Sequence, residues 1–264
     1  MSGPALFWIG EEDRVAESPE GRVLEPGPTL SRHLEKSLRA KPGDVFRFVD
    51  PDRPDLQFRG TVAALSPLRI LLASESLPEA EESRGGRPFD LAVGLLKGES
   101  YEDLIEPAAC LGVRRLVPLS ADRSQARWSL DQFERKRLRF EAKVREASQL
   151  AGRPDRMRLL PPNTLSGLLE SREGAFVLFF DEDPAAGSFQ EALEAAEKSP
   201  SLLAVTGPEG GWSERERALF RTFETTKNGR RASLGSRILP GRLAPVVVAG
   251  VLSLWTDPEK RRTE

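Results

Sequence analysis

Residues 202–212 read LLAVTGPEGGW, Ser213 follows directly, and Glu216 stands three residues after Ser213. A short apolar run that leads into glycines and a helix start predicts a buried strand, a tight loop and a helix. Ser213 and Glu216 have the spacing of a capping box in the first turn of that helix. Loops after parallel strands lie at the edge where open α/β folds bind ligands, and glycines let a ligand approach the main chain. The stretch therefore predicts an α/β fold with a ligand loop at Gly207, although a tight turn without a ligand would need the same glycines.

Similar apolar runs occur on both sides of this stretch. They are FDLAVGLL at 89–96, RRLVPL at 114–119, MRLL at 157–160, AFVLFF at 175–180 and RASL at 231–234. Segments with helical periodicity or strong helix formers separate these runs. Such alternation predicts a mostly parallel sheet with helices on both faces.

A second loop with a glycine follows the last of these runs. It contains Gly235, Ser236 and Arg237, and it leads to LAPVVVAGVLSLW at 243–255, a segment that is apolar on every side. We expect this helix to be buried, either in the core or against another subunit. If the strands at 202–205 and 231–234 are neighbours, their loops lie side by side and form two walls of one pocket.

The longest predicted helix covers residues 131–151. Asp131 is the expected N-cap, with Glu134 three residues later, and Gly152 and Pro154 are the expected stop. One helix face is apolar and consists of Phe133, Phe140, Val144, Ala147 and Ala151. The polar residues Arg135, Arg139, Glu146, Gln149 and Arg153 form another face, which fits a solvated surface or an RNA contact.

The N-terminal part of the chain has a different pattern. Runs of β-branched and aromatic residues at 45–49, 56–65 and 68–73 occur together with the breakers PDRPD and GPT. The charged, glycine-containing stretch PEAEESRGGRP at 78–88 then predicts a linker. We therefore expect a small β-rich domain over residues 1–82 and an α/β domain over residues 83–264.

Composition limits the classes of function. The chain of 264 residues has 39% hydrophobic and 30% charged residues and a net charge of −2, as expected of a globular protein. One cysteine, Cys110, excludes an internal disulfide, and one histidine, His33, excludes a metal site with several imidazoles, so we expect no metal. The longest run without a charged residue, 243–256, has 14 residues and is too short to cross a membrane. Because no signal or transit peptide is visible, we expect a cytoplasmic protein without membrane attachment.

Basic residues are concentrated in the middle of the chain. Residues 114–158 contain 13 basic and 6 acidic residues, whereas residues 1–83 contain 10 basic and 15 acidic residues. Arginine is the better partner for phosphates and stacked bases, and the chain has 31 arginines and 8 lysines. A GC-rich genome accounts for the total number of arginines but not for the clustering of basic residues at 114–158. The segment therefore favours contact with a polyanion.

Several separated motifs, in order, resemble the ribosomal RNA small subunit methyltransferase E (RsmE) family of the SPOUT class. The resemblance covers nearly the whole chain. The motifs are His33-Leu34, Leu38-Arg39, Lys41, Gly43-Asp44, Lys97-Gly98, EPAACLGV at 106–113, Asp122-Arg123-Ser124, EASQLAGR at 146–153, TGPEGGWSERE at 206–216 and LGSRIL at 234–239.

The resemblance implies a PUA-like or OB-like β-barrel at the N-terminus, which binds RNA, and a C-terminal SPOUT domain with a trefoil knot and a mostly parallel sheet. It implies S-adenosylmethionine as cofactor, a homodimer, and methylation of a uridine at N3 in 16S ribosomal RNA of the small ribosomal subunit. The cofactor-binding residues so implied are Thr206, Gly207, Gly210, Gly211, Leu234, Gly235, Ile238 and Leu239.

Substrate-directed roles are hypotheses for three side chains and six basic residues. Arg237 and Arg242 are expected to orient the uracil or its phosphate. Glu209 is the candidate proton acceptor, although it could instead stabilise the start of the following helix. The expected RNA-binding residues are Arg39, Lys41, Arg123, Arg127, Arg145 and Arg153.

The chain departs from the family after Leu239. The family usually continues with Arg, a short spacer and Glu-Thr-Ala, whereas this chain has Pro240, Gly241, Arg242, Leu243 and then Ala244. Main-chain contacts to the cofactor survive such a change, but side-chain roles do not carry over. Two alternatives therefore stand beside the enzyme: a SPOUT-like RNA-binding module with lost or altered methyl transfer, and a methyltransferase for a different RNA nucleotide.

Overall fold

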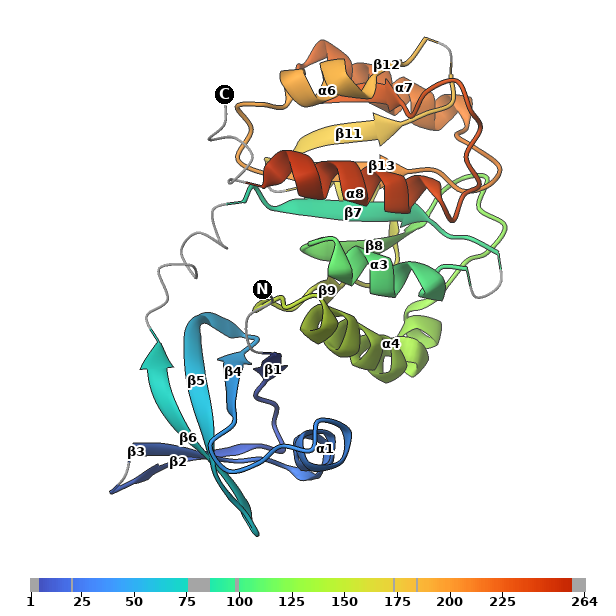
Figure 1. Cartoon of the computed structure of the whole chain (residues 1–264). Coiled ribbons are helices and arrows are strands. Elements are labelled where there is room, and N and C mark those ends of the chain that lie inside the picture. The colour runs from blue at the N-terminus through green and yellow to red at the C-terminus, as the bar shows by residue number, and fades with distance from the viewer. Residues whose placement is uncertain are drawn as a thin grey trace. The chain divides into compact units, whose positions relative to one another are not determined.

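The structure, a computed structural model, describes residues 5–19, 21–75, 86–97, 100–172, 174–183 and 185–257 (Figure 1). It divides into two compact units, and each is described by itself. The first comprises Met1–Arg84 with Ser148–Arg156, and the second comprises Gly85–Ala147 with Met157–Glu264. Residues 78–85 of the predicted linker lie outside the described part of the chain.

The first unit is built on a six-stranded sheet with the order β1-β4-β5-β6-β3-β2. Only the β1–β4 pair is parallel, and the other pairs are antiparallel. The strands predicted at 45–49, 56–65 and 68–73 are confirmed as β4, β5 and β6. The elements are β1 (Leu6–Trp8), β2 (Arg14–Ser18), β3 (Gly21–Glu25), α1 (Pro28–Arg32), a π-helical turn (His33–Ser37), β4 (Val45–Asp50), β5 (Arg53–Leu65) and β6 (Leu68–Glu75).

The core of the first unit lies between the sheet and the α1 segment. Leu30 and Leu34 pack there with Phe48 and Ile70. Residues 148–156 complete the unit from far along the sequence: Trp8 N donates to Gln149 Oε1 at 3.2 Å, and Trp8 Nε1 donates to the Arg153 carbonyl at 2.9 Å. The indole N–H of a buried tryptophan is thereby satisfied.

The second unit contains a sheet whose described pairs are all parallel, in the order β10-β8-β7-β13-β11-β14-β12, with β9 beside β8. The predicted parallel sheet is thus confirmed, because each apolar run forms a strand. The strands are β7 (Phe89–Gly94), β8 (Arg115–Ser120), β9 (Arg158–Leu159), β10 (Asn163–Thr164), β11 (Phe176–Phe180), β12 (Gly187–Ser188), β13 (Leu202–Thr206) and β14 (Gly229–Ser233).

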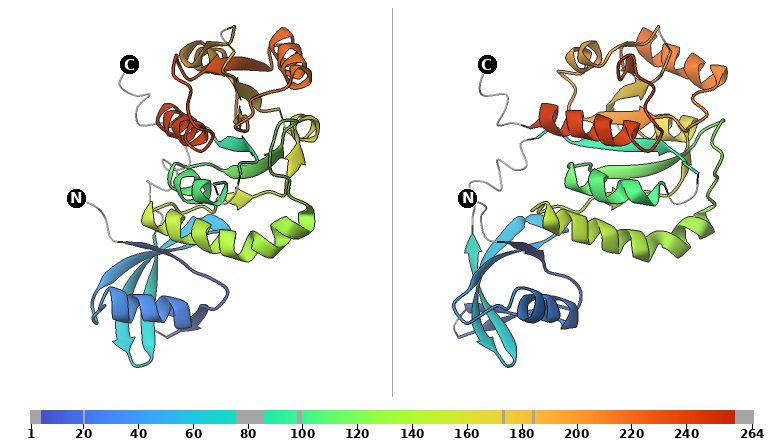
Figure 2. Two further views of the ribbon diagram at one scale, coloured as in Figure 1. Left: turned by 90° about the vertical axis from the view of Figure 1, so that its right-hand side faces the viewer. Right: turned by 45° about the vertical axis from the view of Figure 1, so that its right-hand side comes forward.

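Helices cover both faces of this sheet (Figure 2). One face, with Val177 and Leu203, packs against α5 and α7. The other face, with Leu91, packs against α3 and α8, which also contact each other. The helical elements are a 3₁₀ turn (Glu102–Leu104), α3 (Ile105–Cys110), α4 (Leu130–Leu150), α5 (Leu165–Glu170), α6 (Phe189–Ala195), α7 (Glu214–Thr225) and α8 (Ala244–Thr256).

The predicted long helix is α4, but its N-cap is not Asp131. Ser129 Oγ accepts a hydrogen bond from Gln132 N at 3.2 Å, and Gln132 Oε1 accepts one from Ser129 N at 3.0 Å. This reciprocal pair is a capping box that begins two residues before the predicted one. The C-terminal prediction is confirmed, because Gly152 has a φ of 68° just after the helix.

The apolar helix α8 is buried on one face only. Val248, Ala249 and Leu252 are buried, whereas Leu254 on the other face is 57% exposed. Within the described residues no helix is both long and apolar enough to span a membrane.

Candidate active site

The candidate site lies at the carboxyl-terminal edge of the parallel sheet. Because the strands are parallel, the segments after β7, β8, β11, β13 and β14 leave the sheet at this same edge. The segment after β13 is the glycine-rich loop, residues 207–213, and the predicted capping box of Ser213 and Glu216 closes it.

The glycine-rich loop is packed tightly against the end of β7. A Cβ at Gly94 would lie 2.3 Å from Pro208 N, and one at Gly207 would lie 3.1 Å from the Trp212 ring. Trp212 is buried beneath the loop, where Nε1 donates to the Phe180 carbonyl at 2.8 Å. The glycines therefore serve the close approach of main chains, and Trp212 has a packing role.

The segment after β8 is joined to the glycine-rich loop by charged groups. Asp122 accepts hydrogen bonds from Ser213 Oγ at 2.6 Å and from Arg215 Nη2 at 2.6 Å. Glu216 is buried, and its carboxylate accepts from Asp122 N at 3.0 Å and Ser213 N at 2.8 Å. The hydrogen bonds from Arg215 and Ser213 lower the pKa of Asp122. These contacts fix the two segments to one another.

The segment after β11 contains a second carboxylate–guanidinium pair. Asp181 is buried, and both of its oxygens accept from Arg217 of α7 at 2.9 Å. This bidentate pair raises the pKa of Arg217, mainly through the hydrogen bond to Asp181. Next to it, a Cβ at Gly211 would lie 3.0 Å from Glu182 Oε1, so this segment also closely approaches the glycine-rich loop.

The segment after β14 reaches the glycine-rich loop by a route that differs from the sequence prediction. The loops after Val205 and Leu234 were expected to be adjacent if their strands were neighbours, but β11 lies between β13 and β14. The contact instead comes later in the segment, where a Cβ at Gly241 would lie 3.0 Å from Leu96 Cδ2 and 3.2 Å from Glu209 Cγ. Residues just before α8 therefore meet the loops after β7 and β13.

The residues predicted to bind a cofactor lie at the end of β13, in the glycine-rich loop and in the segment after β14. Thr206 is buried and donates to the Ala92 carbonyl at 3.4 Å, so its side chain is occupied in the sheet. Ile238 is 85% exposed, and Gly235 has a φ of 105° with open space where a Cβ would be. Of the remaining set, Gly210 is exposed, and Gly207, Gly211, Leu234 and Leu239 are half-buried.

The three candidate catalytic side chains, Glu209, Arg237 and Arg242, are exposed at this edge. Glu209 Oε1 accepts a hydrogen bond from Lys97 N at 3.3 Å. Arg242 follows Gly241, which packs on Glu209, whereas Arg237 lies earlier in the segment after β14. The structure thus brings Glu209 close to the segment that carries Arg242.

The basic residues predicted to bind RNA have different surroundings. In the first unit, Arg39 and Lys41 are exposed, and Arg39 has a φ of 53°. In the second, Arg123 and Arg127 are exposed, and Arg123 Nη1 donates to the Gly210 carbonyl at 3.4 Å. Arg145 of α4 is half-buried. The Arg153 side chain is 11% exposed and pairs with Asp155 at 2.6 Å, so a phosphate contact there requires that pair to open.

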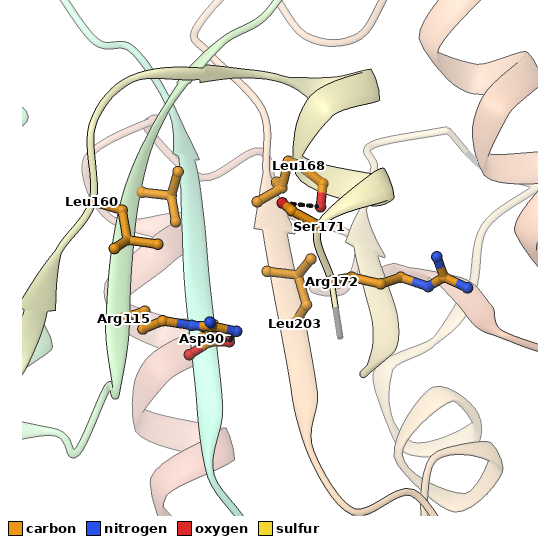
Figure 3. Close-up of a pocket in the computed structure, with 8 residues that line it drawn as sticks. Asp90, Arg115, Leu160, Leu168, Ser171, Arg172 and Leu203 are labelled. Atoms are coloured by element: carbon orange, nitrogen blue, oxygen red, sulfur yellow. Dashed lines mark hydrogen bonds and ion pairs between the residues drawn. The ribbon is translucent and has the colours of Figure 1, made fainter. Parts of the chain in front are cut away.

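A cavity of about 130 Å³ lies elsewhere, at the amino-terminal end of the sheet (Figure 3). Asp90 and Arg115 lie side by side in it, with leucines on both sides, and the guanidinium of Arg172 points away from them. Asp90 accepts hydrogen bonds from both Arg114 and Arg115, at 2.7 and 2.8 Å for the shortest contacts. Its charge is therefore already matched, and this cavity is a structural ion-pair site under α5.

Three features of this site were not predicted from the sequence. They are the contacts of Asp122, the bridge that Glu216 forms between two loops, and the hydrogen bond from Lys97 N. Asp122 and Arg215 are 93 residues apart in sequence, so no local pattern links them. The available signal was the motif Asp122-Arg123-Ser124, which pointed to the segment but not to its partner.

The fold and this site define a class of protein: an α/β domain with a glycine-rich loop at the carboxyl edge of a parallel sheet. The chain belongs to the RNA methyltransferase domain family, whose model matches residues 84–253. The resemblance to the RsmE family is confirmed by relatives of that name.

Two such relatives are called ribosomal RNA small subunit methyltransferase E. The protein from Synechocystis is 28% identical over 245 residues, which cover 89% of this chain and 75% of the relative. The protein from Bacillus subtilis is 28% identical over 172 residues, which cover 63% of this chain and 66% of the relative.

Solved structures share the fold. A Legionella pneumophila protein in complex with S-adenosylmethionine superimposes with a TM-score of 0.73 at 20% identity and covers 96% of this chain and 98% of its own. A ribosomal RNA small subunit methyltransferase E from Neisseria gonorrhoeae bound to S-adenosylmethionine has a TM-score of 0.71 at 17% identity, with the same coverage. These likenesses show that the chain shares its fold with these proteins.

Proposed function

We propose that the chain is an S-adenosylmethionine-dependent methyltransferase that modifies N3 of a uridine in 16S ribosomal RNA of the small subunit. The observation that carries the proposal is the glycine-rich loop at the carboxyl edge of the sheet, held on both sides by neighbouring loops, in a chain of the RNA methyltransferase domain family. The names of the relatives support ribosomal RNA as substrate, and the ligand of two structural neighbours supports the cofactor.

The residues at this edge fit such a cofactor. Gly210 and Gly235 are exposed, although the Gly210 carbonyl accepts a hydrogen bond from Arg123, and a Cβ at Gly235 would meet open space. Main-chain groups of both segments therefore face the surface. Bound there, a sulfonium donor supplies an activated methyl group. The holding residues in this proposal are Thr206, Gly207, Gly210, Gly211, Leu234, Gly235, Ile238 and Leu239, with Thr206 acting through its main chain.

The protein's own contribution is to position the uracil and assist proton loss. Uracil N3 carries a proton at neutral pH and takes part in base pairing, so the base must be unpaired before N3 can react. Arg237 and Arg242 are exposed at the site and supply positive charge that favours the deprotonated base or binds its phosphate. In this proposal, ordering of the base beside the cofactor loops raises the rate through orientation.

RNA binding in this proposal uses two surfaces. The first unit, proposed to be a PUA-like barrel over residues 1–82, contributes Arg39 and Lys41. The second contributes Arg123, Arg127 and Arg145, and Arg153 of the first unit is the weakest member because of its pair with Asp155. Arg123 also contacts the glycine-rich loop, which links RNA binding to the cofactor edge.

We further propose a homodimer and a trefoil knot in the domain over residues 83–264. The partly exposed apolar face of α8, which includes Leu254, supports association with a second copy. The return of the chain from β14 at one side of the sheet to α8 against β7 and β13 supports the knot. Light scattering that finds only monomer at micromolar concentration would contradict the dimer.

The decisive experiment maps methylated nucleotides in ribosomal RNA from cells with and without the protein. Loss of one N3-methyluridine in 16S RNA is the expected result, and loss of a different modification supports the methyltransferase for another nucleotide. Calorimetry with S-adenosylmethionine tests the binding-module alternative, which the residues after Leu239 allow. A titration that shows no binding heat contradicts the enzyme. Arg242→Glu, which restores the family's charge, should change the rate of transfer; an unchanged rate excludes a catalytic role for Arg242.

A further inference from the structure

Three segments of the second unit meet at the side chain of Glu209. The end of the β7 segment contributes Lys97 N, which donates to Glu209 Oε1 at 3.3 Å. The segment before α8 contributes Gly241, where a Cβ would lie 3.2 Å from Glu209 Cγ and 3.0 Å from Leu96 Cδ2. Glu209 itself belongs to the glycine-rich loop. Glu209 is therefore placed to hold the other two segments against the glycine-rich loop.

The backbone around this meeting point is fixed on the sheet side. Leu95 N donates to the Leu119 carbonyl at 2.9 Å, and Leu96 is buried. Glu209, in contrast, is exposed, and no ion pair joins it to a basic side chain within the described residues. Neither burial nor a counter-charge keeps the carboxylate in place, so its hydrogen bond to Lys97 N is the contact that orients it.

We infer that Glu209 is a positioning residue, which holds the segment at Lys97 and the segment at Gly241 against the glycine-rich loop and so presets the main-chain groups proposed to bind the cofactor. This inference deepens the proposed function and rests on it. It assigns Glu209 a different role from that of proton acceptor, because accepting a hydrogen bond from an amide requires an oxygen at this place and not a titrating group.

Two substitutions separate the roles. Glu209→Gln keeps the length of the side chain and an acceptor oxygen but cannot take up a proton at neutral pH, whereas Glu209→Ala removes both. Glu194→Ala, at an exposed position of α6, is the matched control for truncation of a surface glutamate. All variants are made in the full chain.

Three quantities are measured: hydrogen exchange of the Lys97 amide without any methyl donor, the Kd of S-adenosylmethionine by calorimetry, and the pH profile of methyl transfer. A lost hydrogen bond to a charged acceptor corresponds to a change of about tenfold in an equilibrium constant. We therefore expect Glu209→Ala to speed exchange and raise the Kd by about tenfold each, and Glu209→Gln to leave both within about threefold with an unchanged pH profile.

The outcomes distinguish this inference from the proposed function. Unchanged Lys97 exchange in Glu209→Ala overturns the positioning role. A Glu209→Gln variant with a normal Kd but a pH profile of methyl transfer that differs from that of the unaltered chain overturns it as well. If the unaltered chain binds no S-adenosylmethionine, the proposed function fails, whereas the exchange rates still decide whether Glu209 holds the three segments.

Discussion

Gly94 offers the sharpest test of how the glycine-rich loop is placed. A Cβ at this position would lie 2.3 Å from Pro208 N and 2.7 Å from Gly207 C, which are main-chain atoms that no rotamer change can move. In Gly94→Ala the loop must retreat by about 1 Å to reach 3.4 Å, where ordinary van der Waals contact begins. Overpacking of this kind costs about 1–3 kcal/mol, and a displacement of about 1 Å in a catalytic site lowers the rate by about 100-fold.

We therefore expect Gly94→Ala to lower the free energy of unfolding by about 1–3 kcal/mol and the rate of methyl transfer by about 100-fold, with weaker binding of S-adenosylmethionine. Urea unfolding followed by tryptophan fluorescence gives the first quantity, and calorimetry gives the affinity. Gly250→Ala in α8 is the matched control, because a Cβ there would meet no atom of another segment within 4 Å. An unaltered free energy of unfolding in Gly94→Ala would refute the close packing. A lowered free energy of unfolding with unaltered affinity for S-adenosylmethionine would show that the loop is not part of the cofactor site.

Three further predictions concern two contacts of this loop and the proposed RNA-binding residues. Trp212→Phe should lower the free energy of unfolding by about 1–3 kcal/mol, measured by urea titration, because the buried Phe180 carbonyl loses its donor. The folded-state pKa of Asp122 is lowered from 3.8, so its contribution to stability is present above that pH and is lost as pH falls through the lower folded value. The stability difference between the unaltered chain and Asp122→Asn, compared at pH 7 and near pH 3, should therefore shrink in acid, and a constant difference would contradict the pair with Arg215. Binding of 16S RNA fragments should weaken with salt, and Arg127→Ala should reduce the slope of log K against log salt by about 0.7–0.9, more than Arg153→Ala, whose guanidinium is already paired.

The strands of the second unit could be predicted well because their signal is local. Strands of a parallel sheet are buried on both faces, so β11 and β13 appear as continuous apolar runs that end at polar or glycine residues. The capping box at Ser213 and Glu216 is equally local, since its two residues are in one helical turn. These features placed the glycine-rich loop correctly after its strand.

The arrangement of the loops could not be predicted in this way because it depends on strand order. The position of β11 between β13 and β14 follows from non-local pairing, which no periodicity records. The prediction of the α4 N-cap was wrong for a related reason. Ser129 and Asp131 are both good capping residues, and the side chain of Gln132 pairs with Ser129. Likewise, the motif at Asp122 identified a segment but not its contact with Arg215.

The assignment of residues 148–156 to the first unit has a consequence for biosynthesis. All strands of that unit's sheet emerge from the ribosome well before Gln149 and Arg153. The two hydrogen bonds of Trp8 can therefore form only after about half of the chain has been synthesised. A fragment that stops at residue 82 would leave the indole N–H of Trp8 without the Arg153 carbonyl. Expression of an autonomous N-terminal module should therefore succeed better when the later segment is supplied in the same polypeptide.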